Sequence, residues 1–244
     1  MRKLGFLVAL PMVGALSGVA PAAAQPTPEI TAFCDAALTT DKAAGKALVE
    51  KPKQKDIQAL ESALAQIEST APAEIAANVQ AAVAATRTAI QNRKDPFDDA
   101  TFEQNLSAID QYRFNSCGYT QLDVTGLEYE FEGLPKTLPA GKVAIRFTDT
   151  GAELHELAIA RMKTKDSAKK LLGMSEKEIN KKIEEIGGSF ATQGQTTYTI
   201  ADLSKPGRYL AACFLPVGST DFANAEKKGT PHWKRGMLQE IKVT

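Results

Sequence analysis

Residues 207–243 read GRYLAACFLPVGSTDFANAEKKGTPHWKRGMLQEIKV, and the fold of the second half of the chain is inferred outward from this stretch. Its two ends, GRYLAACFL and MLQEIKV, are short apolar or alternating runs, which are typical of buried strands. The segment between them is polar and carries Gly and Pro, so it is expected to be a surface loop. This pattern places Cys213 at the end of one strand, and His232 and Met237 where the chain returns to the next.

Strand signals continue upstream of this stretch. Residues 127–151 alternate apolar and polar side chains between Gly and Pro, and residues 153–162 and 196–203 are further strand candidates. Residues 165–187 return to helical spacing and are interpreted as a helical insertion between strands. Several short strands with regular turn signals predict a β-sandwich or a barrel for residues 125–244.

The first half of the chain has the period of helices. Two runs, residues 55–67 and 71–90, carry apolar side chains at helical spacing. Together with helical segments around residues 33–49 and 98–112, they predict an antiparallel bundle of three or four helices over residues 25–118. This half contains no histidine, Gly-rich phosphate loop or metal-ligand spacing. The predicted fold class is therefore α+β, in two parts.

The first residues have the pattern of an export signal. Two basic residues are followed by an apolar or small run, residues 4–19, and by Ala22–Ala24 before a cleavage point. A membrane anchor is the alternative, although Pro11 and three glycines interrupt a run that is short for a bilayer span. We expect a signal peptide over residues 1–24 and a secreted or periplasmic protein. No other segment is apolar enough to span a membrane.

The charge balance argues against two classes of partner. Lys plus Arg number 29, as do Asp plus Glu, so the formal net charge is zero. A chain without a net field is not expected to bind nucleic acid or an anionic membrane surface. The scattered carboxylates and two histidines suggest neither a catalytic set nor a small-molecule substrate.

The chain has three cysteines, an odd number. Thiols of exported proteins tend to pair, so the presence of a third, unpaired cysteine calls for an explanation. The simplest arrangement is a disulfide between Cys34 and Cys117, with Cys213 kept as a thiol or thiolate. Closing a loop of this length adds about 4 kcal/mol in the loop-entropy model.

Four side chains in the second half form a candidate metal-binding set. The only two histidines are His155, which follows a turn at residues 149–151, and His232. With Cys213 and Met237 they supply two imidazoles, a thiolate and a thioether, a mixed set that suits copper, whereas zinc rarely accepts a thioether. Taken singly, each of the four is as readily explained by packing or by a loop position.

Residues 125–244 resemble the cupredoxin family of blue-copper proteins, of the plastocyanin and azurin type. The family's G-x-Y-x-x-x-C strand corresponds to residues 207–213, and its His, four residues, and Met preceded by Gly correspond to residues 232–237. An early histidine near a turn corresponds to His155. The resemblance implies a Greek-key β-sandwich and one copper ion, with His155, Cys213, His232 and Met237 as ligands.

One feature departs from the family pattern. Eighteen residues, 214–231, separate Cys213 from His232, where blue-copper proteins normally have only a few. Lengthening a loop a few-fold costs less than about 2 kcal/mol, so the same end geometry is still possible. Such a loop resembles a variant among exported bacterial cupredoxin-like proteins.

The resemblance implies a carrier of single electrons rather than a catalyst. Met237 is expected to be a weak axial ligand, and an exposed edge of His232 is expected to exchange electrons with an unidentified redox partner. Two alternatives remain: a copper carrier with an exchangeable site, which receives its ion from a copper donor, and a metal-free binding module. The carboxylates of Glu153 and Glu156 flank His155 and could orient a ligand or attract a cation, but a solvated strand edge is the expected position for both.

Overall fold

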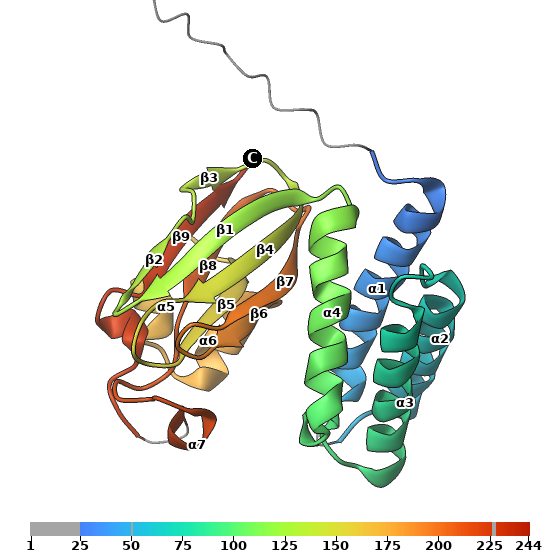
Figure 1. Ribbon diagram of the computed structural model, residues 1–244. Coiled ribbons are helices and arrows are strands. Elements are labelled where there is room, and N and C mark those ends of the chain that lie inside the picture. Colours follow the sequence, from blue (N-terminus) through green and yellow to red (C-terminus); the bar gives the residue numbers. More distant parts are fainter. Residues whose placement is uncertain (1–24, 50, 226–227) are drawn as a thin grey trace, which may run out of the picture.

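The computed structural model describes residues 25–49, 51–225 and 228–244. A bundle of helices occupies the first half of the chain and two β-sheets the second, and the two halves lie side by side (Figure 1). The predicted signal peptide, residues 1–24, lies outside the described residues. Within the described part of the chain, no helix is both long enough and apolar enough to cross a membrane.

Between residues 25 and 118, the described part of the chain forms four α-helices: α1 (Pro28–Ala47), α2 (Gln54–Thr70), α3 (Ala76–Asn92) and α4 (Ala100–Ser116). Side-chain caps begin two of them, since Thr27 accepts from the amide of Ile30 at α1 and Asp99 accepts from the amide of Thr101 at α4. The apolar positions predicted from helical spacing form the core, together with many alanines. A disulfide joins Cys34 in α1 to Cys117 at the end of α4, and both cysteines are buried.

The described residues of the second half include nine strands: β1 (Thr120–Leu127), β2 (Glu130–Glu132), β3 (Thr137–Leu138), β4 (Gly141–Asp149), β5 (His155–Met162), β6 (Ile183–Ala191), β7 (Thr196–Leu203), β8 (Gly207–Ala212) and β9 (Leu238–Val243). They make two sheets, with orders β2-β1-β4-β7 and β3-β9-β8-β5-β6. The pairs β1–β4 and β3–β9 are parallel and the others antiparallel, so both sheets are mixed. The predicted α+β fold with a β-sandwich is confirmed.

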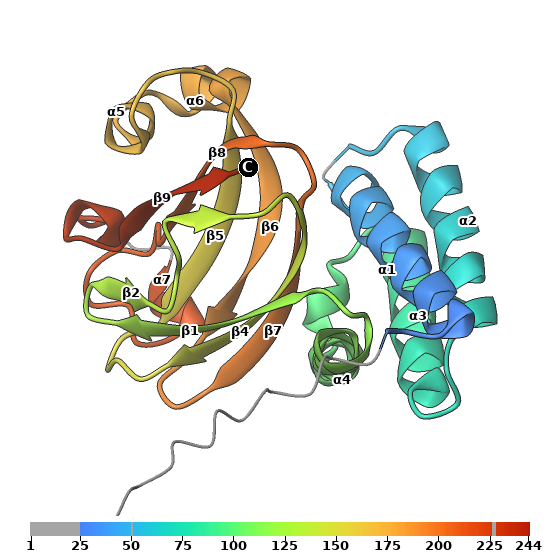
Figure 2. The same ribbon diagram turned by 90° about the horizontal axis from the view of Figure 1, so that it is seen from above.

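Alternate side chains along β4 point to opposite faces of the first sheet, which explains how the helical bundle and the second sheet pack against it. Val143, Ile145 and Phe147 point into the core between the two sheets. Ala144 points the other way, toward Phe114 of α4 and Leu38 of α1. The outer face of the first sheet is therefore covered by the helical bundle, as Figure 2 shows from above.

The outer face of the second sheet is covered by the helical insertion. The insertion forms two short helices, α5 (Ala168–Leu172) and α6 (Glu176–Lys182). Leu171 and Leu172 of α5 pack against Met162 and Leu210 of the sheet, and Ile179 of α6 is partly buried in the same cluster. The insertion ends earlier than expected, because residues 183–187 belong to β6, where Ile183 pairs with Met162. Pairing with β5 outweighs the local helical spacing there, since strand formation depends strongly on tertiary context.

Candidate metal centre

Three of the four candidate ligands meet at one end of the sandwich. His155 is the first residue of β5, Cys213 directly follows β8, and His232 opens a 3₁₀ turn, η2 (His232–Lys234). Because β5 and β8 are antiparallel neighbours, the start of one lies beside the end of the other. The relative exposure of all three residues is 0%.

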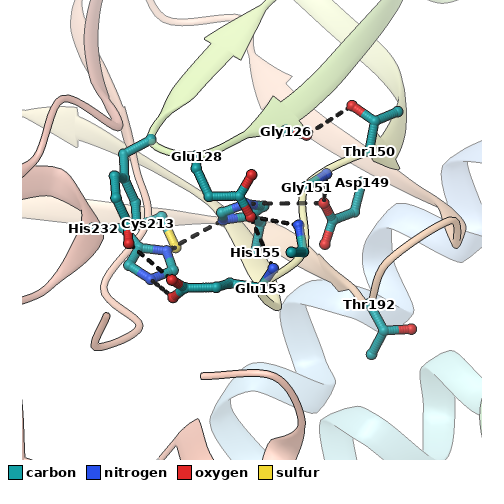
Figure 3. A network of polar contacts seen from close by, with 12 residues as sticks. Gly126, Glu128, Asp149, Thr150, Gly151, Glu153, His155, Thr192, Cys213 and His232 are labelled. Carbon is teal, nitrogen blue, oxygen red and sulfur yellow. Dashed lines mark hydrogen bonds and ion pairs between the residues drawn. The ribbon is translucent and has the colours of Figure 1, made fainter. Parts of the chain in front are cut away.

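The donor atoms of these side chains converge (Figure 3). Nδ1 of His155 lies 3.2 Å from Nδ1 of His232, which lies 3.3 Å from Sγ of Cys213. The three donor atoms all lie within 4.8 Å of one another. Metal–nitrogen and metal–thiolate bonds of about 2.0–2.3 Å hold donors in a plane roughly 3.5–4 Å apart, so one ion fits among them after small shifts.

Backbone hydrogen bonds close the long loop at its base. The amide of Trp233 donates to Cys213 O, that of His232 to Leu215 O, and that of Val217 to Thr230 O, each at 2.9 Å. Pro216 and Pro231 form a bridge within this ladder. The 18-residue excursion therefore returns to its starting point, and His232 arrives beside Cys213 as it would at the end of a short loop.

The main chain of Met237 lies at the same pole of the sandwich, where it is hydrogen-bonded to His232 and Cys213. Its amide donates to His232 O at 3.2 Å, and its carbonyl accepts from the amide of Cys213 at 3.1 Å. The residue is fully buried in the sandwich core. Its role as a fourth ligand stays a prediction.

The outer edge of His232 is closed by a carboxylate and a tyrosine. Its Nε2 lies 3.0 Å from Oε2 of Glu153. The ring of Tyr129 packs over the imidazole with centroids 4.8 Å apart, and its hydroxyl donates to Glu153 at 2.8 Å. The expectation of an exposed His232 edge is therefore wrong, as is the expectation that Glu153 lies on a solvated strand edge.

His155 also has carboxylates on its far side. Its Nε2 lies 3.6 Å from Oε1 of Glu128 and 3.9 Å from Oδ1 of the buried Asp149. Gly151 allows this approach, because a Cβ there would meet His155 Nε2 at 2.6 Å and the Glu128 carboxylate at 2.5 Å. Both imidazoles thus face negative charge on the Nε2 side and converge on the Nδ1 side.

This arrangement fits a metal cation. Carboxylates only accept hydrogen bonds, so their positions favour a proton on Nε2 of each ring and a lone pair on each Nδ1. Two nitrogen lone pairs 3.2 Å apart repel, unless a cation lies between them or one ring is protonated at Nδ1. Two imidazoles and a sulfur facing one point are the soft, mixed donors that suit copper.

Burial sets the protonation of the donor groups. It lowers the pKa of both imidazoles, with His232 adding to the effect at His155 and the carboxylates opposing it. Burial raises the pKa of the Cys213 thiol to about 12, although the amides of Glu156 and Leu215 oppose this. The rings are neutral at pH 7, as metal ligands must be, and the thiol must release a proton when a metal binds.

Sequence reasoning missed most of the groups around the donors. Glu128 and Tyr129 lie on the turn between β1 and β2, far from the ligands in the chain. Their roles depend on how this turn closes over the end of the second sheet, and no local periodicity carries that information. Asp149 and Gly151 were recognised only as part of a turn.

Comparisons with known proteins found similarity only to solved structures, and at a low level. No family model matches the sequence, and no curated protein matches it. Among solved structures, a reduced auracyanin from Roseiflexus castenholzii is 19% identical and covers 51% of this chain and 97% of its own, with a TM-score of 0.35. Auracyanin A from Chloroflexus aurantiacus, described as a "blue" copper protein, is 18% identical over 51% and 98%, with a TM-score of 0.33.

A third solved structure is similar to the same half of this chain. Rusticyanin from Thiobacillus ferrooxidans is 17% identical and covers 51% of this chain and 78% of its own, with a TM-score of 0.32. The matched half of this chain is the C-terminal one. The candidate centre itself consists of two imidazole nitrogens and a thiol sulfur, buried together at one pole of the β-sandwich.

Proposed function

We propose that this chain is an exported copper-binding protein that carries single electrons through one copper ion. His155, Cys213 and His232 would hold the ion through two Nδ1 atoms and one Sγ, and Met237 would be a weak fourth ligand. The ion would supply the change of oxidation state, and the protein would supply a fixed, water-excluding set of donors.

The observation that carries this proposal is the convergence of three fully buried donors. Each is fixed by backbone: His155 by the register of β5, Cys213 by the end of β8, and His232 by the ladder at the base of the loop. A site fixed in this way rearranges little when the ion changes charge, which favours electron transfer.

The environment of the sulfur also supports a bound thiolate. Sγ of Cys213 accepts from the amide of Glu156 at 3.3 Å. The amide of Phe214, the residue after Cys213, donates to the carboxylate of Glu156 at 3.1 Å. An amide that points at a sulfur stabilises its negative charge, as a thiolate ligand requires.

Copper carriage is supported less well than electron transfer. A carrier needs an exchangeable site, whereas the exposure of all three donors is 0% and the loop folds over His232. A metal-free module would need one ring protonated at Nδ1 to avoid repulsion across the 3.2 Å contact, whereas the carboxylates beside both Nε2 atoms favour the proton at Nε2.

Optical titration with Cu(II) tests the proposal. Wild-type protein should bind one equivalent and develop an intense thiolate-to-copper charge-transfer band. Cys213→Ser should lose the band, and His155→Gln should lose most of the bound copper. Met237→Leu should keep the band and shift the reduction potential. A colourless wild type that retains no more copper than the double variant Cys213→Ser/His155→Gln would exclude the proposed function.

A further inference from the structure

We propose that Glu153 is a positioning residue that holds His232 in the tautomer required for metal binding and fastens the inserted loop over it. This inference deepens the proposed copper site and rests on it for its biological meaning. Its physical basis is a set of contacts within the protein, and these are measurable whether or not copper binds.

The carboxylate of Glu153 accepts hydrogen bonds from three separate segments of the chain. Oε2 accepts from the amide of Gly218 in the loop at 2.6 Å and from Nε2 of His232 at 3.0 Å. Oε1 accepts from the hydroxyl of Tyr129 at 2.8 Å. Only 16% of the Glu153 side chain is exposed, so these donors replace most of its contact with water.

These contacts fix the tautomer of His232. A carboxylate has no proton to give, so the imidazole donates from Nε2 and keeps its lone pair on Nδ1. That nitrogen is the one that faces Cys213 and His155. The opposite tautomer would place a lone pair against the Glu153 carboxylate and a proton among the donors, and a ring flip would break both sets of contacts.

His155 gives an internal comparison. Its two carboxylates are farther away, at 3.6 and 3.9 Å, and its Nε2 has no hydrogen-bond partner among the described residues. Its ring is instead positioned by its place at the start of β5, next to the sandwich core. His232 belongs to the 3₁₀ turn η2 and not to a strand, so the orientation of its ring depends much more on its carboxylate partner.

Glu153 also links the ligand to the loop. Beside the bond from Gly218 to Glu153, the amide of Leu154 donates to Ser219 O at 2.6 Å. Two consecutive residues before β5 are therefore joined to two consecutive residues of the loop. Removing the carboxylate leaves the backbone bond and deletes the contact that couples this part of the loop to the imidazole.

Nuclear magnetic resonance of metal-free protein tests the tautomer directly. The chain has only two histidines, so long-range ¹H–¹⁵N correlation yields two ring systems, which a His155→Gln variant assigns. We expect His232 of the wild type to be protonated at Nε2, and Glu153→Gln and Glu153→Ala to give a tautomer mixture. Protonation at Nδ1 in the wild type, or an unchanged spectrum in both variants, would overturn the inference.

Copper retention gives a second readout. Loss of such an orienting partner typically weakens metal binding about 10- to 100-fold, and we expect this for Glu153→Gln, with thermal melts to confirm folding. Glu240→Gln is the matched control, since its carboxylate also accepts a backbone amide, that of Ala168, but touches neither imidazole. Equal retention by the Glu153 and Glu240 variants would contradict the positioning role.

The two tests separate this inference from the proposed function. If the wild type retains no copper while His232 shows the Nε2–H form that depends on Glu153, the copper function fails and the positioning role stands. If copper binds with its charge-transfer band and the tautomer is independent of Glu153, the function stands and the positioning role fails.

Discussion

The two halves of the molecule reach stability by different means. The helical bundle has a core rich in alanine and is closed by the Cys34–Cys117 disulfide, across a sequence separation of 83 residues. The β-sandwich has a core of large side chains such as Phe147, Tyr209 and Ile145, and within the described residues it has no disulfide. Its one cysteine, Cys213, stays free and lies in the candidate centre.

The cysteines of the helical half form a crosslink between α1 and the end of α4, whereas the cysteine of the β-sandwich belongs to the candidate centre. The bundle covers the outer face of the first sheet, and the donors lie at the end of the sandwich where β5 begins (Figures 1 and 3). Changes in one half are therefore expected to leave the other largely unaffected.

Removing the disulfide should have the largest effect. The double variant Cys34→Ala/Cys117→Ala should destabilise the bundle by about 4 kcal/mol, because the unfolded chain regains the entropy that the crosslink removes. Chemical denaturation followed by helical circular dichroism should show this loss, while the copper charge-transfer band persists to higher denaturant. Simultaneous loss of both signals would mean that the two halves unfold as one unit.

The contact between the halves is the next test. Phe114 is buried at this contact, where its ring meets Tyr198 edge-on with centroids 5.4 Å apart. Phe114→Ala should cost about 3 kcal/mol in the free energy of unfolding, and it should leave the copper spectrum unchanged. Phe97→Ala is the control, because Phe97 is exposed on the bundle and its loss should cost less than about 1 kcal/mol. Similar losses for both would show that the contact adds little.

The amount that the sequence reveals also differs between the halves. Helical spacing alone locates the bundle core, since Leu60, Leu64, Val79 and Val83 all become buried. In the sandwich, alternation indicates most of the strands, but it misses most of β1 and assigns the start of β6 to a helix. His155, Cys213 and His232, which the sequence singles out, lie together in the structure. Both inferences depend on local periodicity and on the pairing of neighbouring strands.

The residues that surround the donor atoms could not be predicted from local periodicity. The burial of His232 depends on a loop that folds back to form the Leu215–His232 hydrogen bond, which involves backbone groups and leaves no mark in side-chain pattern. Glu153 resembles any surface carboxylate until the Gly218 amide and the Tyr129 hydroxyl are brought to it. Contacts between segments distant in sequence decide both outcomes.

The same substitution should have opposite effects in the two halves. Gly151→Ala forces a methyl group between the Glu128 carboxylate and the His155 ring, so it should destabilise the sandwich by about 2 kcal/mol and weaken copper retention roughly tenfold. Gly45→Ala in α1 meets no atom within 4 Å and should stabilise the bundle by about 1 kcal/mol. Thermal melts and copper titration measure both, and normal copper retention by Gly151→Ala would contradict the close packing around His155.

The smallest effect should come from ion pairs between the halves. Lys42 of α1 lies 2.6 Å from Asp202 of β7. Burial raises the pKa of Asp202, but hydrogen bonds from Lys42 and Ser204 outweigh it and lower this pKa to about 2, from an ordinary value of 3.8. A lowered carboxyl pKa stabilises the fold above about pH 4, and this stabilisation disappears as the pH falls toward 2.

Asp202→Asn should therefore cost about 1 kcal/mol at pH 6 and almost nothing at pH 2, because Lys42 is largely exposed and water screens the pair. Asp35→Asn removes the other ion pair across this boundary, that of Lys142 with the more exposed Asp35, and should cost less than about 0.5 kcal/mol at either pH. Urea unfolding at the two pH values measures the difference. A cost for Asp202→Asn that does not change between pH 6 and pH 2 would assign the stabilisation to packing and hydrogen bonding rather than to charge.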